Sequence, residues 1–423
     1  MSQADASTHA SHTPHPKPHA FVDTAIVGAG IAGTWVARQL QDAGYRVLVI
    51  EQSGWGAGQT GVSQGIIHGG LKYALLGDAS PPNSEFRDMP QRWRACLNGT
   101  DSVDLQGVRV MSDGFYLFAG PGMVNRGRTF AAARASFGNV DAVEQTAWPA
   151  ALQGLKGSVY RIDDLVLDIP SLLGALNKNL LTRTRKHTLQ AQDISADEDG
   201  YNLSLGGERI HCRYLINCSG AGSDALIKGL GINDLPMQLR PLHQVVVKPR
   251  HQQVLFAHCL TGITRNEPRL TITSHRSNNA TLGTPAPGSD SDDCLWYLGG
   301  QLATEGVQRS PAAQIDHARD ELQACLPWLD WAEADFDTLR VDRAEASPEL
   351  AAAGQSVAAQ RERFIQCFPT KLTLAPVLGD QVLRCLQAPA AQGPDLSLEG
   401  PQLAASSREF EPLRQRANGL QPE

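Results

Sequence analysis

Residues 24–33 read TAIVGAGIAG, an apolar run that passes directly into a GxGxxG motif. The first four of these residues suit a short, buried parallel strand. A helical stretch over Thr34–Ala43 ends at a glycine, and Arg46–Ile50 (RVLVI) predicts a second strand. Glu51 stands at the carboxyl end of that second strand. This order of strand, glycines, helix, strand and acid predicts a βαβ unit that binds a dinucleotide.

The glycines of the motif have separate physical roles. Gly28 permits the tight turn from strand to helix, Gly30 lets the backbone approach a pyrophosphate, and Gly33 lets the helix lie on the strand. The start of the helix offers unpaired N–H groups and a partial positive charge to the phosphates. Glu51 has nearly the usual spacing, about 20 residues, of an acid that binds ribose hydroxyls. The cofactor contacts predicted in this unit are Gly28, Gly30, Ile31, Ala32, Gly33, Glu51 and Gln52.

A second glycine-rich stretch follows, where an NAD enzyme would usually complete a contiguous nucleotide domain. Residues 56–73 read GAGQTGVSQGIIHGGLKY, and so many glycines let the backbone pass close to a flat ligand. The stretch resembles the flavin-facing loop of the glycerol-3-phosphate dehydrogenase and D-amino-acid oxidase superfamily, where IHGGLRY stands in place of the IHGGLKY of Ile67–Tyr73. The resemblance implies FAD as the cofactor. The contacts it implies in this loop are Thr60, Ser63, Gln64, Gly65, Ile67 and His68.

Two later segments resemble the same superfamily. Tyr214–Asp224 (YLINCSGAGSD) is similar to its strand and turn near the FAD phosphates and ribityl chain, which implies contacts from Ser219 and Gly220. Phe368–Pro376 (FPTKLTLAP) is similar to its FGGKLTTYR segment, which opens a helix pointing at the flavin pyrimidine carbonyls. A helix N-terminus there would stabilise negative charge on the reduced flavin. The contacts implied in this segment are Lys371, Leu372 and Thr373.

The resemblance spans roughly residues 21–390 and implies an α/β (α+β) fold. A discontinuous, Rossmann-like FAD-binding domain is expected over residues 21–78, 155–230 and 335–395. A second, mostly antiparallel β-sheet domain that binds the substrate is expected over 79–154 and 231–334, and its β-rich runs fit this assignment. Residues 276–293 hold turn formers and acids and predict a long loop. Residues 1–20 and 396–423 are expected to be tails.

The amino-acid composition disfavours several classes of function. The chain has 423 residues, with 37 Lys and Arg against 44 Asp and Glu, for a net charge of −7, which disfavours a nucleic-acid partner. Its eight cysteines form no CxxC pair and no zinc spacing, so free thiols and no metal site are predicted. The four histidines of residues 1–20 could bind a metal ion, but mobile polar tails are commoner. No apolar run reaches the roughly 18 residues of a membrane helix.

Oxidation of an alcohol or an amine by a flavin requires a group that takes the substrate proton. His243 lies in RPLHQVVV (240–247), which is similar to the superfamily stretch where a histidine faces the substrate. We expect it to be the base, with a structural histidine as the alternative. His68 in the flavin loop is expected to have a supporting or catalytic role. Some amine-oxidising relatives attach FAD to a histidine at a comparable place, but the IHGG form is closer to the non-covalent members.

A clamp for the substrate's negative charge is also required. Arg343 in LRVDRAE (339–345) is similar to the arginine of the superfamily's sGvRPl segment, and an arginine can hold a carboxylate or phosphate with two hydrogen bonds. Arg340 is the alternative clamp, and an ion pair with Asp342 or Glu345 is the alternative role for Arg343. Lys72 replaces the arginine of the family loop and would still supply a positive charge.

The resemblance therefore implies an FAD-dependent oxidoreductase, a dehydrogenase of a C–OH group in a small anionic metabolite such as glycerol-3-phosphate or a 2-hydroxy acid. A hydride would pass to flavin N5, and electrons would leave to a quinone or another redox partner. The alternatives are an amine or amino-acid oxidase, a flavin domain that acts on modified tRNA, and a flavin-binding protein without turnover. A cytoplasmic location is expected, and peripheral contact with the inner membrane stays open.

Overall fold

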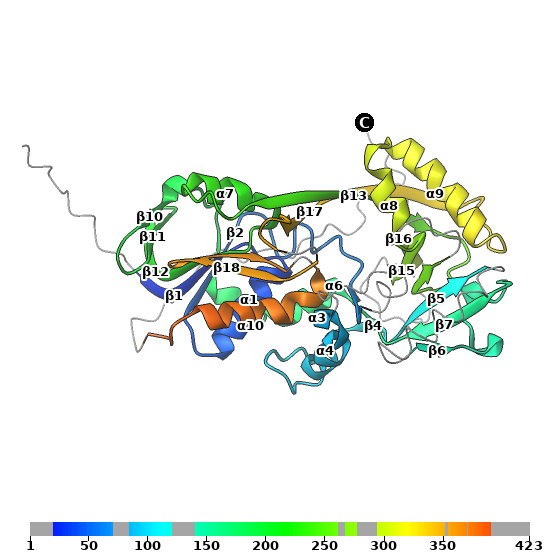
Figure 1. Ribbon diagram of the computed structural model, residues 1–423, viewed down its shortest axis with the longest axis horizontal. Helices are drawn as coiled ribbons and strands as arrows, with labels where there is room; N and C mark the ends of the chain where they lie inside the picture. The colour runs from blue at the N-terminus through cyan, green and yellow to red at the C-terminus, as the bar shows by residue number, and fades with distance from the viewer. Residues whose placement is uncertain are drawn as a thin grey trace, which may run out of the picture.

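The computed structural model describes residues 20–70, 84–120, 140–260, 267–276, 294–351, 354–369 and 371–390. Two large β-sheets organise these residues, and a small three-stranded sheet lies with them (Figure 1). Lys72, most of the predicted loop 276–293 and nearly all of the two predicted tails lie outside the described residues. All eight cysteines lie in the described residues, where none of them forms a disulfide and seven are buried. Across the described residues, no helix has both the length and the apolar character needed to cross a membrane.

The first sheet is built on parallel strands in the order β9–β2–β1–β12–β19. Their bounds are β1 (Ala20–Val27), β2 (Val47–Glu51), β9 (Thr184–Lys186), β12 (Glu208–Asn217) and β19 (Phe364–Phe368). Antiparallel strands extend the sheet at β10 (Ile194–Ala196), β11 (Tyr201–Leu205) and β18 (Val357–Arg361). The run TAIV is buried on both faces, as expected for a central parallel strand.

Helices cover both faces of the first sheet. On one face, α1 (Ile31–Asp42) and α10 (Ala375–Cys385) lie side by side over Ile26, Val47 and Val49 (Figure 1). On the other, α7 (Ser223–Gly229) covers Val22 and Leu48. Helix α1 begins three residues earlier than the helical pattern predicts, directly after the glycine turn. The predicted βαβ unit is therefore confirmed, with parallel β1 and β2 on either side of α1 in the chain.

The second sheet is mostly antiparallel, with the order β17–β13–β16–β15–β14–β5–β7–β6. Its strands are β5 (Phe115–Ala119), β6 (Val140–Ala142), β7 (Ser158–Ile162), β13 (Met237–Lys248), β14 (Ala257–Cys259), β15 (Leu270–Arg276), β16 (Cys294–Gly299) and β17 (Asp335–Ala346). Among the described strands of this sheet, β14 and β5 are the one pair that runs parallel. Strands β13 and β17 run together from one domain into the other (Figure 1). The predicted fold class is thus confirmed.

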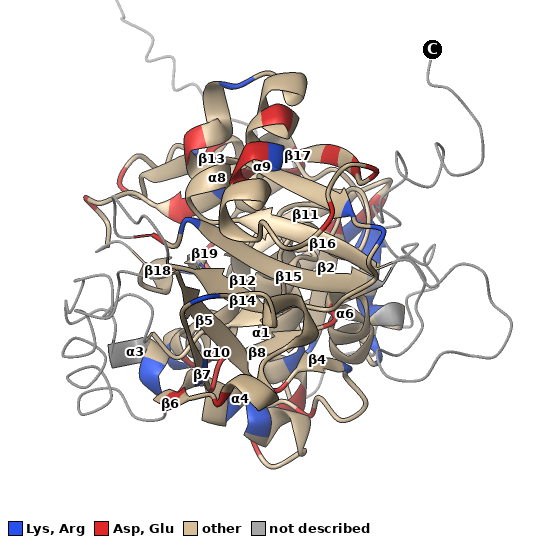
Figure 2. Ribbon diagram, turned by 90° about the vertical axis from the view of Figure 1, so that its right-hand side faces the viewer, with Lys and Arg blue, Asp and Glu red and all other residues tan. Residues whose placement is uncertain are grey.

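The two faces of the second sheet differ. Helices α8 (Gln301–Glu305) and α9 (Pro311–Cys325) cover one face, which we call the helix face, and pack on Val245 and Val247 (Figure 2). Alternate residues, such as Val246 on β13, point to the other face. That face meets the glycine-rich loop through a contact between Thr273 and Gln64, and we call it the loop face.

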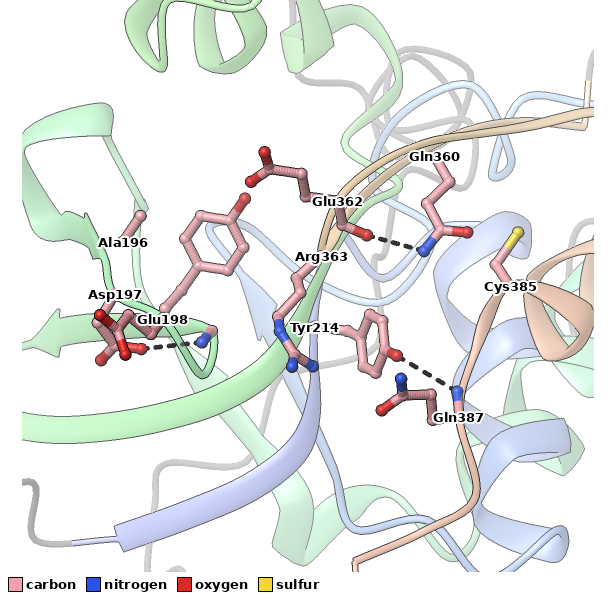
Figure 3. Close-up of a pocket in the computed structure, with 11 residues that line it drawn as sticks. Ala196, Asp197, Glu198, Tyr214, Gln360, Glu362, Arg363, Cys385 and Gln387 are labelled. Carbon is pink, nitrogen blue, oxygen red and sulfur yellow. Dashed lines mark hydrogen bonds between the residues drawn. The ribbon is translucent and has the colours of Figure 1, made fainter.

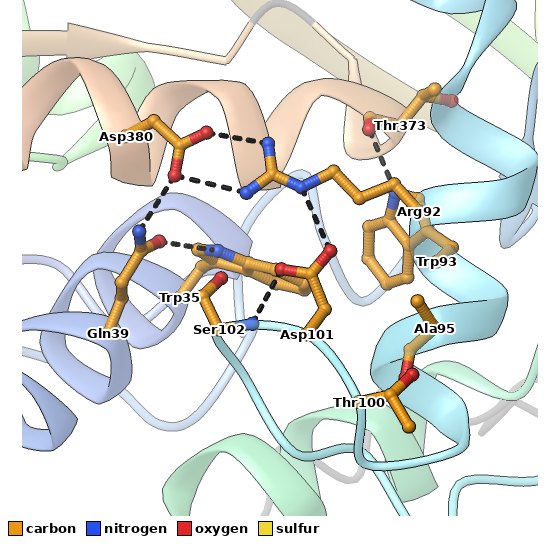
Figure 4. A network of polar contacts seen from close by, with 10 residues as sticks. All are labelled: Trp35, Gln39, Arg92, Trp93, Ala95, Thr100, Asp101, Ser102, Thr373 and Asp380. Carbon is orange, nitrogen blue, oxygen red and sulfur yellow. Dashed lines mark hydrogen bonds and ion pairs between the residues drawn. The ribbon is translucent and has the colours of Figure 1, made fainter.

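Domain boundaries differ from the expected ones in two places. Strands β7 and β17, expected in the FAD-binding domain, belong to the second sheet. Conversely, α3 (Ser84–Arg87) and α4 (Met89–Leu97), expected in the substrate domain, pack against the FAD-binding domain. The rings of Trp93 and Trp35 meet at 4.8 Å between centroids. Beside them, Arg92 donates to both carboxylate oxygens of Asp380 on α10, at 2.6 and 3.0 Å (Figure 4).

The three-stranded sheet joins the glycine-rich loop to the rest of the molecule. Its order is β3 (Ile66–Ile67), β8 (Leu165–Leu167) and β4 (Val110–Ser112), and β8 is the central strand. Helix α6 (Ile169–Asn177) follows β8, and the carboxylate of Asp168 caps it by accepting from the backbone N–H of Ser171. This sheet places the segment that ends the loop beside the turn between β7 and β8.

Candidate active site

The first glycine turn is so tight that side chains are excluded from it. Gly28 has φ +102°, and a Cβ there would lie 2.6 Å from the carbonyl oxygen of Cys218. A Cβ on Gly33 would lie 1.9 Å from the carbonyl oxygen of Gly28. These contacts bring β1, the start of α1 and the end of β12 together at one edge of the parallel sheet. The edge formed by the carboxyl ends of the strands is where such sheets bind ligands.

Glu51 lies across from this turn. Its carboxylate accepts from the backbone N–H of Ala29 at 2.8 Å and from that of Ser53 at 2.7 Å. Each hydrogen bond uses one carboxylate oxygen, so both oxygens retain capacity to accept from ribose hydroxyls. Gln52, the next predicted contact, is exposed. The acid is therefore held at the carboxyl end of β2, beside the phosphate-binding turn.

Thr60 ties the second glycine-rich loop to the start of helix α1. Its buried Oγ1 accepts from the backbone N–H of Ile31 at 2.9 Å. A Cβ on Gly30 would approach this oxygen to 3.1 Å, so the loop and the turn are in near contact. Ala32 follows in the first turn of the helix and is buried. The two glycine-rich segments therefore lie against each other at the N-terminus of α1.

A buried amide pair supports the turn after β12. Asn217 is fully buried, and its Nδ2 donates to Oε1 of Gln366 on β19 at 2.7 Å. The hydroxyl of Ser219 donates to Oδ1 of Asn217 at 2.6 Å, and Gly220 follows with φ +57°. Neither amide was predicted as a site residue, although polar residues inside the apolar runs YLIN and FIQCF are a usable signal. They hold the turn that carries Ser219 and Gly220.

Gln64 fastens the glycine-rich loop to the loop face of the second sheet. Its Nε2 donates to the carbonyl oxygen of Tyr297 at 3.1 Å and to Oγ1 of Thr273 at 3.2 Å. Gly65 follows with φ +71°, and a Cβ there would lie 2.2 Å from the carbonyl oxygen of Leu167. Before it, Ser63 is half-buried. The loop is therefore fixed between the two domains.

The end of the loop meets the segment that opens α10. The backbone N–H of His68 donates to Oγ1 of Thr373 at 2.9 Å, across 305 positions of sequence. The indole N–H of Trp93 donates to the carbonyl oxygen of Thr373 at 2.9 Å (Figure 4). Lys371 is beside this contact, with Nζ 4.7 Å from the ring centroid of Phe86, and Leu372 and Ile67 pack in the same apolar cluster. Two segments with independent resemblance to flavin contacts thus lie together.

His68 is paired with a buried carboxylate. Its Nδ1 lies 3.1 Å from Oδ2 of Asp164, and the backbone N–H of Gly69 donates to Oδ1 of the same residue at 2.7 Å. Asp164, in the turn between β7 and β8, is 2% exposed. His258 on β14 joins the pair, with its ring centroid 6.3 Å from that of His68. Neither Asp164 nor His258 was predicted, because their positions in the sequence show no relation to His68.

The structure places His243, the residue expected to be the base, apart from the glycine-rich loop. Its Nδ1 lies 2.9 Å from the carbonyl oxygen of Gly306 beyond α8, so the ring is on the helix face, away from the flavin loop. Burial lowers the pKa of His243, and the positive charges of Arg340 and Arg309 lower it further, while the contact with Gly306 opposes them. His243 is fully buried there, on the opposite side of the sheet from the glycine-rich loop.

Arg340, the alternative clamp, lies on the same side of the sheet as His243. It pairs with His243 across β13 and β17, and its guanidinium donates to the carbonyl oxygen of Val307 at 2.7 Å on the helix face. Arg343 is three positions after Arg340 on β17, so its side chain points to the opposite face of the sheet. It is paired with Arg240 of β13. Arg240 itself pairs with the buried carboxylate of Glu345 at 3.2 Å. Arg343 therefore remains on the side of the sheet that the loop contacts.

Two further polar side chains lie on the loop face. Gln244 is 5% exposed, and no hydrogen-bond partner is found for its Oε1 among the residues that the structure describes. His275 has Nε2 3.0 Å from Oγ1 of Thr273 and its ring 4.3 Å from that of Tyr297. Burial lowers the pKa of His275 to about 4, although the negative charge of Asp168 opposes this, so the ring is neutral near pH 7. Neither residue was predicted as part of the site.

A separate cavity of about 420 Å³ lies elsewhere, lined by Tyr201, Tyr214, Glu362, Arg363 and Gln387 among others (Figure 3). Its lining includes Glu362 and Arg363, in the turn that precedes the amino end of β19, and Tyr214 on β12. It is therefore at the opposite edge of the parallel sheet from Gly28 and Glu51. Ligands of such sheets bind at the carboxyl ends of the strands, so this cavity is not the cofactor site.

The residues present fit FAD. The glycine cradle, the helix N-terminus and the carboxylate of Glu51 suit a pyrophosphate and a ribose. The loop that continues to His68 brings backbone between the two domains, where a flat ring system can lie against it. The acid and the glycines alone would suit NAD as well, so the second loop is the feature that favours a flavin.

Comparison with known proteins agrees with this assignment. A family model described as FAD dependent oxidoreductase matches residues 23–356. The probable FAD-dependent oxidoreductase PA4991 of Pseudomonas aeruginosa is 39% identical over 372 residues, which are 86% of this chain and 90% of that protein. Its crystal structure superposes with a TM-score of 0.74 and 33% identity, over 96% of this chain and 100% of that one.

More distant structures share the fold. Glycine oxidase of Geobacillus kaustophilus has a TM-score of 0.61 at 16% identity, covering 86% of this chain and 94% of its own. L-α-glycerophosphate oxidase of Mycoplasma pneumoniae, solved with FAD bound, has a TM-score of 0.60 at 14% identity, covering 88% and 97%. At these identities the likeness concerns the fold only. Because the family model covers most of the chain, the protein belongs to the DAO family of FAD-dependent oxidoreductases.

Proposed function

We propose that this oxidoreductase dehydrogenates a C–OH group of a small anionic metabolite, such as glycerol-3-phosphate or a 2-hydroxy acid. The observation that carries the proposal is the pair formed by His68 and the buried Asp164 at the end of the flavin loop. FAD, when bound, supplies the acceptor for the two electrons. The protein must then supply a base for the hydroxyl proton and a partner for the negative charge.

His68 is suited to the base role. With Nδ1–H donating to Asp164, the neutral imidazole carries its lone pair on Nε2, where a hydroxyl can donate. Asp164 is a positioning residue, because it fixes the ring and stabilises the positive charge that forms when His68 takes the proton. The protonated ammonium form of an amine substrate loses its proton to water far more readily than an alcohol does, and the neutral amine that results needs no further deprotonation before oxidation. A buried carboxylate–imidazole pair therefore favours alcohol oxidation over amine oxidation.

The loop face supplies recognition groups in this proposal. Arg343 would hold the carboxylate or phosphate of the substrate, and Lys72, outside the described residues, would add a second positive charge. Gln244 is a further candidate contact, because its buried amide lies on the same face. The mixed acidic and basic residues visible in Figure 2, together with the net charge of −7, support a small-molecule substrate over a nucleic acid.

An anaerobic titration of the flavin spectrum tests the proposal. Glycerol-3-phosphate and 2-hydroxy acids are added first, followed by N-methyl and free amino acids. Bleaching by a hydroxy compound is the expected result. Bleaching by amines alone would contradict it in favour of an amine oxidase. The acceptor, proposed as a quinone or another redox partner, is then identified by reoxidation of the bleached enzyme with quinone analogues, in comparison with oxygen.

A further inference from the structure

We propose that His68, Asp164 and His258 form a binding site for a divalent transition-metal ion, with Zn²⁺ as the probe. Each residue offers one ligand atom, and these atoms all lie within 4.8 Å of one another. The three come from different parts of the chain: the residue after β3, the turn between β7 and β8, and strand β14. Metal binding at this cluster does not rest on the proposed function, although its effect on turnover does.

The distances suit a zinc ion after a small side-chain movement. A tetrahedral ion with bonds of about 2.0 Å separates its ligand atoms by roughly 3.3 Å. The 3.1 Å between Nδ1 of His68 and Oδ2 of Asp164 is already close to that separation. The widest separation, at most 4.8 Å, needs to shrink by about 1.5 Å, which rotation of an imidazole supplies. Three protein ligands leave the fourth position for water.

Outer contacts orient two of the three ligands. Nδ1 of His258 lies 2.9 Å from Oγ1 of Thr271, and a ring that donates through Nδ1 presents the lone pair of Nε2 to an ion. Asp164 accepts the backbone N–H of Gly69 on Oδ1 at 2.7 Å, so its Oδ2 faces His68. Such second contacts fix ring orientation and raise the affinity of a metal site.

Charge and burial favour a transition metal here. When both imidazoles are neutral, as metal ligands must be, they and the carboxylate together carry a net charge of −1, which attracts a divalent cation. His258 and Asp164 are 0% and 2% exposed, so the attraction is only weakly screened by water. Two imidazoles with one carboxylate suit zinc and its first-row neighbours, whereas magnesium and calcium prefer oxygen ligands alone.

Metal binding and the base role of His68 exclude each other. An ion on Nδ1 replaces the proton shared with Asp164, and the neutral imidazole then carries its proton on Nε2. The lone pair that would take the substrate proton is thereby removed. Zn²⁺ should consequently act as a reversible inhibitor that a chelator relieves.

Calorimetric titration of the chelator-treated holoenzyme with Zn²⁺ tests the site directly. The histidines of residues 1–20 would bind zinc too, so they are replaced by Gln: His9, His12, His15 and His19. One ion per chain is the expected result. His258→Gln should remove this binding, and Thr271→Val should weaken it by roughly tenfold through loss of the outer contact. His275→Gln, a change of another loop-face histidine, is the matched control and should bind as the parent does.

Thermal melting and the FAD absorbance confirm that each variant is folded and loaded. Equal zinc binding by the parent and by His258→Gln would overturn the proposal. Zinc inhibition of flavin bleaching in the parent, absent in His258→Gln, is the expected second result. If no substrate bleaches the flavin but calorimetry finds one ion that depends on His258, the proposed function fails while the metal site stands.

Discussion

The two faces of the second sheet use histidine in opposite ways. On the helix face, the His243 ring is fully buried, with its Nδ1 against the carbonyl oxygen of Gly306. On the loop face, His68 pairs with Asp164 beside His258, next to the segment that opens α10. The second sheet lies between the two groups, because side chains at alternate positions of its strands point to opposite sides, with His243 of β13 on one side and His258 of β14 on the other. The face of the sheet on which a histidine lies therefore has to be known before a role in catalysis can be proposed for it.

The largest expected effect is on the rate of flavin reduction, and it is measured by replacing His68 and His243 one at a time. His68→Asn removes the proposed base and should lower the rate of flavin reduction by roughly 10²–10⁴-fold. His243→Gln, on the helix face, should leave that rate nearly unchanged in the folded holoenzyme. Anaerobic stopped-flow spectroscopy of the oxidised-flavin absorbance band measures both rates. Equal losses in the two variants would show that the distinction between the faces is wrong.

The two arginines of β17 provide the next contrast. Arg343→Ala should raise KM for an anionic substrate by roughly 10–100-fold, because a hydrogen bond to a charged group contributes about 1.5–3 kcal/mol. Arg340→Ala removes contacts with backbone carbonyls of the helix face and should leave KM unchanged. Steady-state kinetics with a hydroxy acid decides between them. A KM effect confined to Arg340→Ala would reverse the assignment.

A third prediction tests whether Gln244, on the loop face, contacts the substrate. Gln244→Leu keeps the volume but removes the amide, and one lost hydrogen bond of about 1 kcal/mol should lower kcat/KM by roughly fivefold. Thermal stability should stay close to that of the parent, because Oε1 has no partner among the described residues. An unchanged kcat/KM would place Gln244 outside the substrate site.

The smallest effect concerns acid stability. His275 has a folded pKa of about 4, below its ordinary value of about 6.5, so the unfolded chain binds more protons between these values. Its contribution to stability is complete above pH 6.5 and is lost as the pH falls toward about 4. His275→Gln should therefore flatten the decline of the melting temperature over this range. Melting curves of both proteins from pH 7 to pH 4 would reveal an unchanged slope if this account is wrong.

Local sequence predicts the nucleotide-binding half well. Residues 24–51 contain strand, turn, helix and strand in unbroken order, and steric exclusion at Gly28 and Gly33 allows few other outcomes. The second sheet offers less information. The run His243–Val247 reads HQVVV without alternation of polar and apolar residues, so the sequence does not indicate which side the histidine occupies.

The sequence alone determined the family, the cofactor and the βαβ turn, because these depend on neighbours within one short segment. Only the tertiary structure showed which histidine lies beside the buried carboxylate of Asp164. His68, Asp164 and His258 are brought together by strand pairing in two different sheets. Pairing register and the face of each strand depend on packing across the whole molecule, which no local pattern encodes.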